Sequence, residues 1–421
     1  MSRLASSGRS PLVVLFLTVF IDLMGFGIVI PLLPIYAEQM NATPFTAGAL
    51  IAVYSLMQLV FAPAWGRISD DIGRRPVLLM CLAGSAMSYL LLAAAWRLEV
   101  LFLARVLAGV AGASIPVAQA YIADVTGPAE RARGMGLIGA AFGLGMVIGP
   151  ALGGGLSLLG PRVPEGFAAG LCLANVLVAA YRLPESLPGS VRRPERFRHP
   201  LSLASLRDAV VWPGAASLLA VFFLVTLGFA VLEGTFSLAA ASRYGYSQAQ
   251  VDWLWVYMGL VAVVVQGWLV GLLARRLPER ALVVLGTAAL GLGFLWIPFA
   301  GRAVGLPIGL LMALALVVGG QGLASPSLSS LISKTVEEGS VYGQALGVSQ
   351  SLSAGARVLG PAGGGLIFSR FDAAAAYLAA AVCAAGAFGL SLLGGRPGGR
   401  AEAQVIRARV GVGARPTRPG R

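Results

Sequence analysis

The chain has 421 residues, of which 57% are hydrophobic and only 12% are charged, and its mean hydropathy is +0.82. Soluble domains carry about 25% charged residues, so this composition excludes an ordinary soluble protein and indicates a surface that faces lipid. The three cysteines lie in apolar runs without the spacing of a disulfide framework or a metal site. The one histidine, His199, lies between apolar segments, and the sequence shows no catalytic triad or phosphate-binding loop. We therefore expect no metal, no cofactor and no enzyme activity.

Twelve apolar segments follow one another along the chain. A hydrocarbon core about 30 Å thick is crossed by roughly 20 apolar residues in a helix, and twelve such helices with short loops fill nearly the whole length. We therefore predict an all-α membrane protein with twelve transmembrane helices and no sizeable soluble domain. The segments are 11–37, 47–65, 76–96, 99–123, 134–158, 166–183, 213–241, 250–273, 281–300, 304–327, 341–369 and 373–394.

The net charge of +13 could indicate a nucleic-acid partner, but the placement of the basic residues argues against one. If the N-terminus is cytoplasmic, 24 of the 31 lysines and arginines lie in segments on that side and five lie in loops on the other. Lysine and arginine are enriched in the cytoplasmic loops of membrane proteins. The distribution predicts a multi-pass protein of the bacterial cytoplasmic (inner) membrane with both termini in the cytoplasm. Its expected surroundings are the lipid bilayer, with no nucleic acid, and we expect a monomer.

Two polar stretches divide the chain. Residues 184–212 hold prolines and charges without a long apolar run, which is typical of a cytoplasmic linker. Residues 396–421 are basic and rich in glycine and proline, a composition typical of a disordered tail. The expected domains are therefore a six-helix bundle over 1–183, the linker, a second six-helix bundle over 213–395, and the tail.

An internal repeat supports the two bundles. The run Gly112–Pro116 resembles Gly322–Pro326 at an offset of 210 residues, and Gly149-Pro150 recurs as Gly360-Pro361 at an offset of 211. Parallel six-helix repeats around an axis along the membrane normal build a class of transporters with a central binding site. We therefore expect two bundles related by such a pseudo-two-fold axis.

Two acids lie well inside the apolar segments. A charged Asp at a helix centre costs about 2.5–3.5 kcal/mol on insertion scales, so such residues generally face a cavity and serve function. Asp22 and Glu233 differ by 211 residues, which predicts equivalent places that face each other across the cavity. We interpret them as candidate sites for proton coupling or substrate, with Arg105 and Arg357 as their expected partners. The alternative is a protonated acid that only hydrogen-bonds a neighbouring helix.

A cavity between the bundles also needs uncharged lining. Aromatic rings attract lipophilic cations, and a few polar groups orient a ligand in a mostly apolar pocket. The candidate lining residues are Phe26, Gln119, Phe142, Phe229, Phe236, Tyr257, Gln321 and Gln350.

Four motifs, in the right order and on the right helices, resemble those of the major facilitator superfamily. Gly66–Pro76 is similar to its signature cytoplasmic loop between helices 2 and 3. Gly145–Gly154 resembles the antiporter motif of the drug:proton efflux branch, Leu103–Gly112 its arginine motif, and Asp22–Pro34 its first-helix motif. The resemblance covers about residues 12–394 and implies alternating access, with a small-molecule substrate and protons as partners.

The Gly66–Pro76 loop has the composition of a gate. It contains Gly66, Asp70, Gly73, Arg74 and Arg75, and Asp70 is placed to cap a helix N-terminus and pair with a cation on the cytoplasmic side. We expect this contact to latch the two halves together. The simpler alternative is a positively charged loop that only sets topology. An acid follows Asp70 where the family generally carries a basic residue, which weakens a detailed charge-relay interpretation.

The antiporter-like helix has small residues at helical spacing: Gly145, Gly149, Pro150, Gly153 and Gly154. Small residues let another helix approach closely, and Pro150 permits a bend. Helix packing alone explains these residues, and a specific role in antiport is the alternative. We expect the close contact to lie between the two halves.

The function predicted from these features is proton-coupled export of small lipophilic or cationic compounds, as in multidrug efflux and antibiotic resistance. Tetracycline efflux is the nearest resemblance, but Ser88 stands where that family carries an acid in helix 3, and residues 281–300 lack its helix 9 acid. Two alternatives stay open: transport of a polar metabolite such as a sugar, and a membrane scaffold or sensor that transports nothing.

Overall fold

The computed structural model describes residues 11–112, 114–126, 128–160, 162–187, 215–300, 308–335 and 340–393, and all regular structure in these ranges is helical. Ten of the helical rods are long and apolar enough to cross a membrane. The 30-residue α6 and the 31-residue α15 complete a set of twelve rods in the described part of the chain. The predicted all-α class and the twelve-helix pattern are confirmed.

The first bundle precedes the expected linker. One of its rods is interrupted near Gly112, so that two helices form one apolar span over Leu98–Ile122. The start of α2 is fixed by its cap, since the Thr43 side chain accepts a hydrogen bond from the Thr46 N–H at 3.2 Å and Pro44 opens the helix. The helices are α1 (Pro11–Gln39), α2 (Pro44–Ile72), α3 (Arg74–Ala93), α4 (Leu98–Ala111), α5 (Ser114–Val125), α6 (Pro128–Ser157) and α7 (Val163–Arg182).

The second bundle follows the linker. Its second rod starts with a capping box between Ser247 and Gln250, and a π-helical turn over Val265–Leu269 joins its two α-helical parts. The 3-10 turn Ile297–Phe299 extends another rod. The helices are α9 (Ala215–Tyr244), α10 (Gln248–Val264), α11 (Val270–Ala274), α12 (Glu279–Trp296), α14 (Ile308–Thr335), α15 (Ser340–Arg370) and α16 (Ala373–Leu393).

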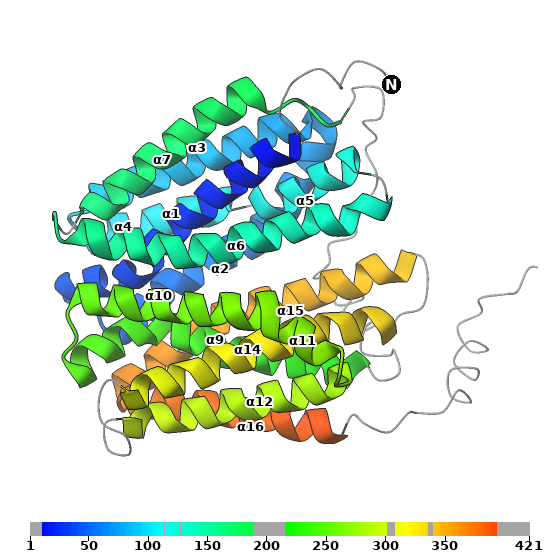
Figure 1. Cartoon of the computed structure of the whole chain (residues 1–421). Helices are drawn as coiled ribbons and strands as arrows, with labels where there is room; N and C mark the ends of the chain where they lie inside the picture. The colour runs from blue at the N-terminus through cyan, green and yellow to red at the C-terminus, as the bar shows by residue number, and fades with distance from the viewer. Residues whose placement is uncertain are drawn as a thin grey trace, which may run out of the picture.

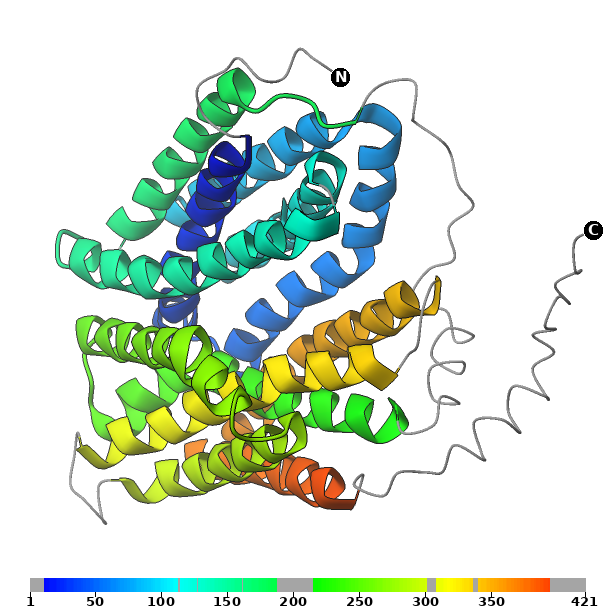
Figure 2. The same cartoon turned by 45° about the vertical axis from the view of Figure 1, so that its right-hand side comes forward.

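The two bundles lie one above the other, and each has its own buried core (Figure 1). They approach at the end where α1 ends and α2 begins, and they diverge toward the opposite end (Figure 2). The end where the bundles approach is called the closed end, and the end where they diverge is called the open end. Of the expected linker, only residues 184–187 are described, and the expected tail lies outside the described residues.

The closed end is held by backbone contacts between α2 and α15. The Phe45 N–H donates to Ser369 Oγ at 2.8 Å. A Cβ atom at Gly48 would clash with the carbonyl oxygen of Pro361, and one at Gly365 with that of Pro44. Only glycine therefore permits this approach of the bundles.

Packing inside the bundles shows the internal repeat. A Cβ at Gly149 of α6 would lie 2.7 Å from the Met24 carbonyl oxygen of α1, and one at Gly360 of α15 would lie 3.0 Å from the Leu227 carbonyl oxygen of α9. The two glycines are 211 residues apart, but Met24 and Leu227 are 203 apart. Helix α1 therefore corresponds to α9 at an offset of 203, because the stretch between the first and fifth helices is eight residues longer in the second half.

The Gly48 contact gives the first prediction. Gly48→Ala should separate α2 from α15 at the closed end, since overpacking of a tight contact costs about 1–3 kcal/mol. Gly363→Ala on α15 is the matched control, because a Cβ there meets no atom within 4 Å. We expect disulfide crosslinking of cysteines placed at positions 45 and 369 to fall in Gly48→Ala and to stay unchanged in the control. Equal crosslinking in both variants would contradict this packing role.

Candidate functional site

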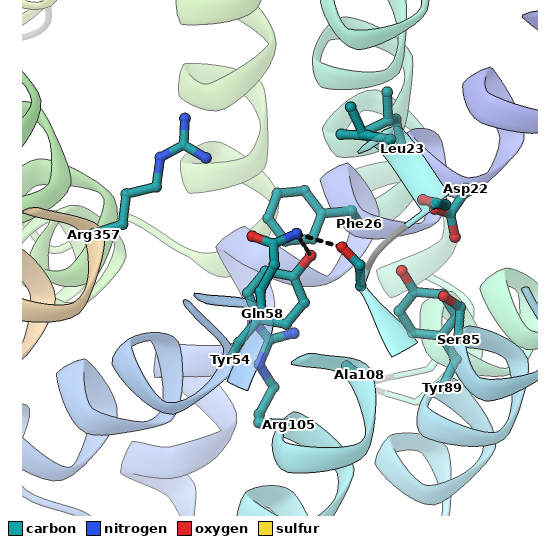
Figure 3. A pocket seen from close by; sticks show the side chains of 13 residues that line it. Asp22, Leu23, Phe26, Tyr54, Gln58, Ser85, Tyr89, Arg105, Ala108 and Arg357 are labelled. Atoms are coloured by element: carbon teal, nitrogen blue, oxygen red, sulfur yellow. Dashed lines mark hydrogen bonds between the residues drawn. The ribbon is translucent and has the colours of Figure 1, made fainter. Parts of the chain in front are cut away.

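A cavity lies in the middle of the molecule and is lined mainly by the first bundle (Figure 3). Helices α1 to α5 supply most of its wall, and Arg357 of α15 is the lining residue from the second bundle among those described. The lining residues are Asp22, Leu23, Phe26, Tyr54, Gln58, Ser85, Tyr89, Arg105, Ala108, Gly112, Ser114, Ile115 and Arg357.

Asp22 is the only acid on the cavity wall in the described residues, and serines hold it. Ser114 Oγ donates to Asp22 Oδ2 at 2.5 Å, and Ser85 is a second side chain that hydrogen-bonds this carboxylate. The break between α4 and α5 places Ser114 in the first turn of α5, with its hydroxyl toward α1. Hydroxyl donors stabilise the ionised carboxylate, so Asp22 has a defined place for its negative charge.

Arg105 is held by an aromatic ring instead of an acid. Its side chain is fully buried, its Nε–H donates to the Leu50 carbonyl oxygen at 3.4 Å, and its guanidinium carbon lies 4.4 Å from the centroid of the Tyr54 ring. Tyr54 also packs against Phe26, with 5.3 Å between the two ring centroids. A cation–π contact compensates part of the cost of burying a guanidinium. The expected pairing of Arg105 with Asp22 is therefore absent from the ion pairs of the described residues.

Arg357 reaches toward the cavity from α15 (Figure 3). Glu233 of α9 is half-buried and is not among the residues that line the cavity, although the charge of Arg357 acts on it. The structure thus brings Asp22, Arg105 and Arg357 to one cavity and leaves Glu233 beside it.

The expected equivalence of Asp22 and Glu233 is wrong. At the offset of 203 residues that the packing of α1 and α9 defines, the counterpart of Asp22 is Val225, a buried core residue. Glu233 lies eight residues further along α9, which is about 12 Å along a helix axis. The sequence repeat suggested 211 because that offset holds for α6 and α15 but not for the first helix of each half.

Of the remaining candidates for the lining, one faces the cavity and the others described lie elsewhere. Phe26 lines the cavity, and Gln119 is exposed on α5 outside it. Phe229 packs against the core of the second bundle, as does Tyr257, whose hydroxyl donates to the Leu311 carbonyl oxygen at 3.0 Å.

Phe236 corrects the expectation, because it is 1% exposed and packs edge-on against Trp255 in that same core. Gln321 is half-buried on α14, and its side-chain oxygen has no hydrogen-bond partner in the described residues. The side chains of Phe142 and Gln350 lie outside the described residues.

The gating loop closes on its own bundle. Arg74 pairs with Asp70 at 2.6 Å and with Asp124 of α5 at 3.1 Å, and Gly73 has a φ of 111° that other residues rarely adopt. The cap of α3 is Glu185, whose carboxylate accepts from the backbone N–H of Arg74 at 2.9 Å and of the next residue at 3.2 Å. Asp70 was expected in this capping role, and Glu185 could not be assigned to it because it lies 111 residues away.

The antiporter-like glycines also act mainly within one bundle. Gly145, Gly149 and Gly153 pack against backbone and side-chain atoms of α1, and the expected contact between halves is made elsewhere on α6, where a Cβ at Gly259 of α10 would lie 2.9 Å from the Met146 carbonyl oxygen. Gly154 is the exception, since a Cβ there would lie 2.9 Å from the Cβ of Asp252 on α10. The motif thus fixes α1, and with it Asp22, against α6.

Sequence reasoning missed Ser114, Ser85 and Tyr54. Ser114 carried a weak signal because it belongs to the repeated Gly112–Pro116 run. Ser85 and Tyr54 carried none, since their roles depend on contacts between helices.

A family model described as Major Facilitator Superfamily matches residues 15–361. The chain belongs to this superfamily. The tetracycline resistance protein, class G, of Vibrio anguillarum is 36% identical over 367 residues, covering 86% of this chain and 91% of that protein. Multidrug resistance protein 2 of Bacillus subtilis (strain 168) is 28% identical over 378 residues, covering 87% and 91%. The crystal structure of the human organic anion transporter MFSD10 superimposes with a TM-score of 0.66 at 27% identity, covering 90% and 98%.

The superfamily assignment agrees with the motifs of the sequence and with the helical architecture. The protein is a multi-pass membrane protein with the fold of this transporter family. In that setting the charged cavity lies at the depth of the membrane, where an ionisable group is costly unless it serves function.

The Asp22–Ser114 contact gives the second prediction. Ser114→Ala removes a hydrogen bond to a charged group worth about 1.5–3 kcal/mol and should lower the thermal stability of the purified protein. Ser88→Ala is the control, because the buried Ser88 hydroxyl has no hydrogen-bond partner in the described residues. In a double-mutant cycle with Asp22→Asn, the effect of Ser114→Ala should shrink. Additive effects would show that the two side chains do not interact.

Proposed function

We propose that the protein is a proton-coupled exporter of drug-like compounds that works by alternating access. The observation that carries the proposal is Asp22, an acid held by serines on the wall of a central cavity between two membrane bundles. The names of two relatives, a tetracycline resistance and a multidrug resistance protein, support efflux as the direction.

The orientation is proposed from the basic residues. If the protein lies in a bacterial cytoplasmic membrane with both termini on the cytoplasmic side, 24 of the 31 lysines and arginines lie in cytoplasmic segments. The closed end then faces outward, and the structure corresponds to the inward-facing state. Arg74, Arg75 and Glu185 at the open end are cytoplasmic in this arrangement.

Asp22 is the proposed proton carrier. In the inward-facing state the ionised carboxylate accepts a hydrogen bond from the Ser114 hydroxyl. When the cavity opens to the outside, the carboxylate takes up a proton. The neutral carboxyl then crosses back in the closed cavity at little electrostatic cost. Release of that proton to the cytoplasm resets the cycle and allows the next substrate to bind.

The substrate class follows from the lining. The aromatic rings Phe26, Tyr54 and Tyr89 suit a lipophilic compound. Cations are favoured while Asp22 is ionised. The wall also carries two guanidinium groups against one carboxylate, and this excess of positive charge favours a second candidate, the export of lipophilic anions.

The third prediction tests the acids. Asp22→Asn should abolish proton-driven transport in proteoliposomes while substrate binding remains measurable, because an amide cannot carry the proton. Glu233→Gln should weaken transport of cationic compounds and spare neutral and anionic ones. Glu99→Gln, an exposed acid outside the cavity, serves as the control. Full proton-coupled activity in Asp22→Asn would remove this carboxylate from the mechanism.

The fourth prediction concerns the proposed latch. The Asp70 side chain is 51% exposed beside Arg74, so one side of its carboxylate is available to the second bundle when the open end closes. Asp70→Asn should leave expression near normal and reduce transport about tenfold or more, as loss of a charge-assisted contact of roughly 1.5–3 kcal/mol implies.

Asp71→Asn is the matched control for Asp70→Asn. Asp71 is the exposed neighbour on the same turn and takes part in no ion pair of the described residues. Equal transport in the two variants would reduce this loop to a topological signal.

A further inference from the structure

Two further acids are buried at the closed end, one from each bundle. Glu165 is the third residue of α7 and Asp252 the fifth residue of α10, and each is 1% exposed. The sequence placed them at helix ends, where an acid is unremarkable. The structure instead excludes both from solvent.

The polar atoms of this pair are incompletely used. Glu165 Oε2 accepts from the Tyr36 hydroxyl at 3.2 Å, but Oε1 has no hydrogen-bond partner in the part of the chain that the structure describes. Both carboxylate oxygens of Asp252 also lack a partner there. Buried polar atoms of native proteins rarely stay unpaired. The unpaired carboxylate oxygens therefore indicate that this cluster binds a species that is not part of the chain.

Charge compensation is also incomplete. Glu165 is the charged group that acts on Asp252, and Arg162 acts on Glu165, while its guanidinium donates to the Ala93 carbonyl oxygen at 3.1 Å. With Tyr36, these are the titratable or charged side chains around the pair in the described residues. Arg162 is exposed and forms no ion pair with either acid in the described residues, so two ionised carboxylates in this buried site repel each other strongly. One added proton removes a charge and supplies the O–H donor that the unpaired oxygens need.

The pair sits where the bundles touch. A Cβ at Gly154 of α6 would lie 2.9 Å from the Asp252 Cβ, so α6 and α10 are in direct contact beside the cluster. Alternating access separates these helices and exposes both carboxylates to water, where each can ionise. Closing the end therefore requires that a proton be bound first.

We propose that Glu165 and Asp252 form a proton-binding site, distinct from the cavity at Asp22, that must be protonated for the closed end to close. In the closed state one carboxyl donates its proton to an oxygen of the other, and the opened state releases that proton to the solution on the same side. The site gates the conformation and carries no net proton across. The assignment of this end to the outside rests on the proposed function, but the proton requirement does not.

The test measures conformation without substrate or transport. The protein, with its native cysteines replaced, receives spin labels at exposed positions 97 and 370, on the closed-end loops of the two bundles, in lipid nanodiscs. We expect the short, closed-end distance at about pH 5 and a shift to longer distances toward about pH 9. The closed-to-open ratio should change by about tenfold per pH unit in the titrating range, as release of one proton requires.

Asp252→Asn and Glu165→Gln should each keep the short distance across the whole pH range, because an amide cannot ionise. Glu99→Gln should titrate like the unchanged protein. Gly154→Ala should favour the long distance at every pH, and Gly155→Ala, whose Cβ meets no atom within 4 Å, should not. The pH response of the unchanged protein tests the proposal even if an acid variant fails to fold.

A pH-independent distance in the unchanged protein would overturn the proposal, as would a normal pH response in both acid variants. Closure by sodium at fixed high pH would overturn it in favour of a metal-cation site. Failure of Asp22→Asn to lose transport would instead overturn the proposed proton carrier and leave this site untouched, so the two failures are distinguishable.

Discussion

Contact between helix backbones through glycine is the constraint on which the rest of the molecule depends. Gly149 against Met24 and Gly360 against Leu227 fix the first helix of each bundle against its fifth helix. Glycine lets the backbones approach closely in a membrane, where apolar side chains gain little from leaving lipid. Because α1 is held in this way, Asp22 has one position, and the serines of α3 and α5 can converge on it.

The charged groups in the interior are each compensated by neighbouring side chains to a different extent. In the interior each ionisable group has a different solution: serine donors for Asp22, the Tyr54 ring for Arg105, and an unfinished cluster for Asp252. At the open end Arg74 joins two acids from separate helices, and Glu185 caps α3. Asp22 and the pair of Glu165 and Asp252 are the interior groups that we propose to change charge, whereas Arg105 stays a fixed cation beside the Tyr54 ring.

Much of the fold could be predicted from the sequence, since hydropathy is a local property. The predicted segment 250–273 corresponds to the rod from Gln248 to Ala274, and the cavity acid Asp22 follows from its place within an apolar helix. The position of Glu233 could not be predicted, because an eight-residue difference in the intervening stretch changes the repeat offset. Glu165 and Asp252 escaped attention for another reason: position along a helix does not reveal depth within an assembly of helices.

The stacking of Arg105 on Tyr54 has a consequence for a bound cation. Because the arginine is stabilised by an aromatic ring, it keeps its charge whether or not Asp22 has bound a proton. In the proposed cycle, protonation of Asp22 therefore leaves the guanidinium groups of Arg105 and Arg357 as the charges on the described cavity wall. In a low dielectric this increase in positive charge acts strongly over a few ångströms. In the proposed cycle, protonation of Asp22 therefore repels a cationic substrate, and the proton gradient supplies the energy of that repulsion.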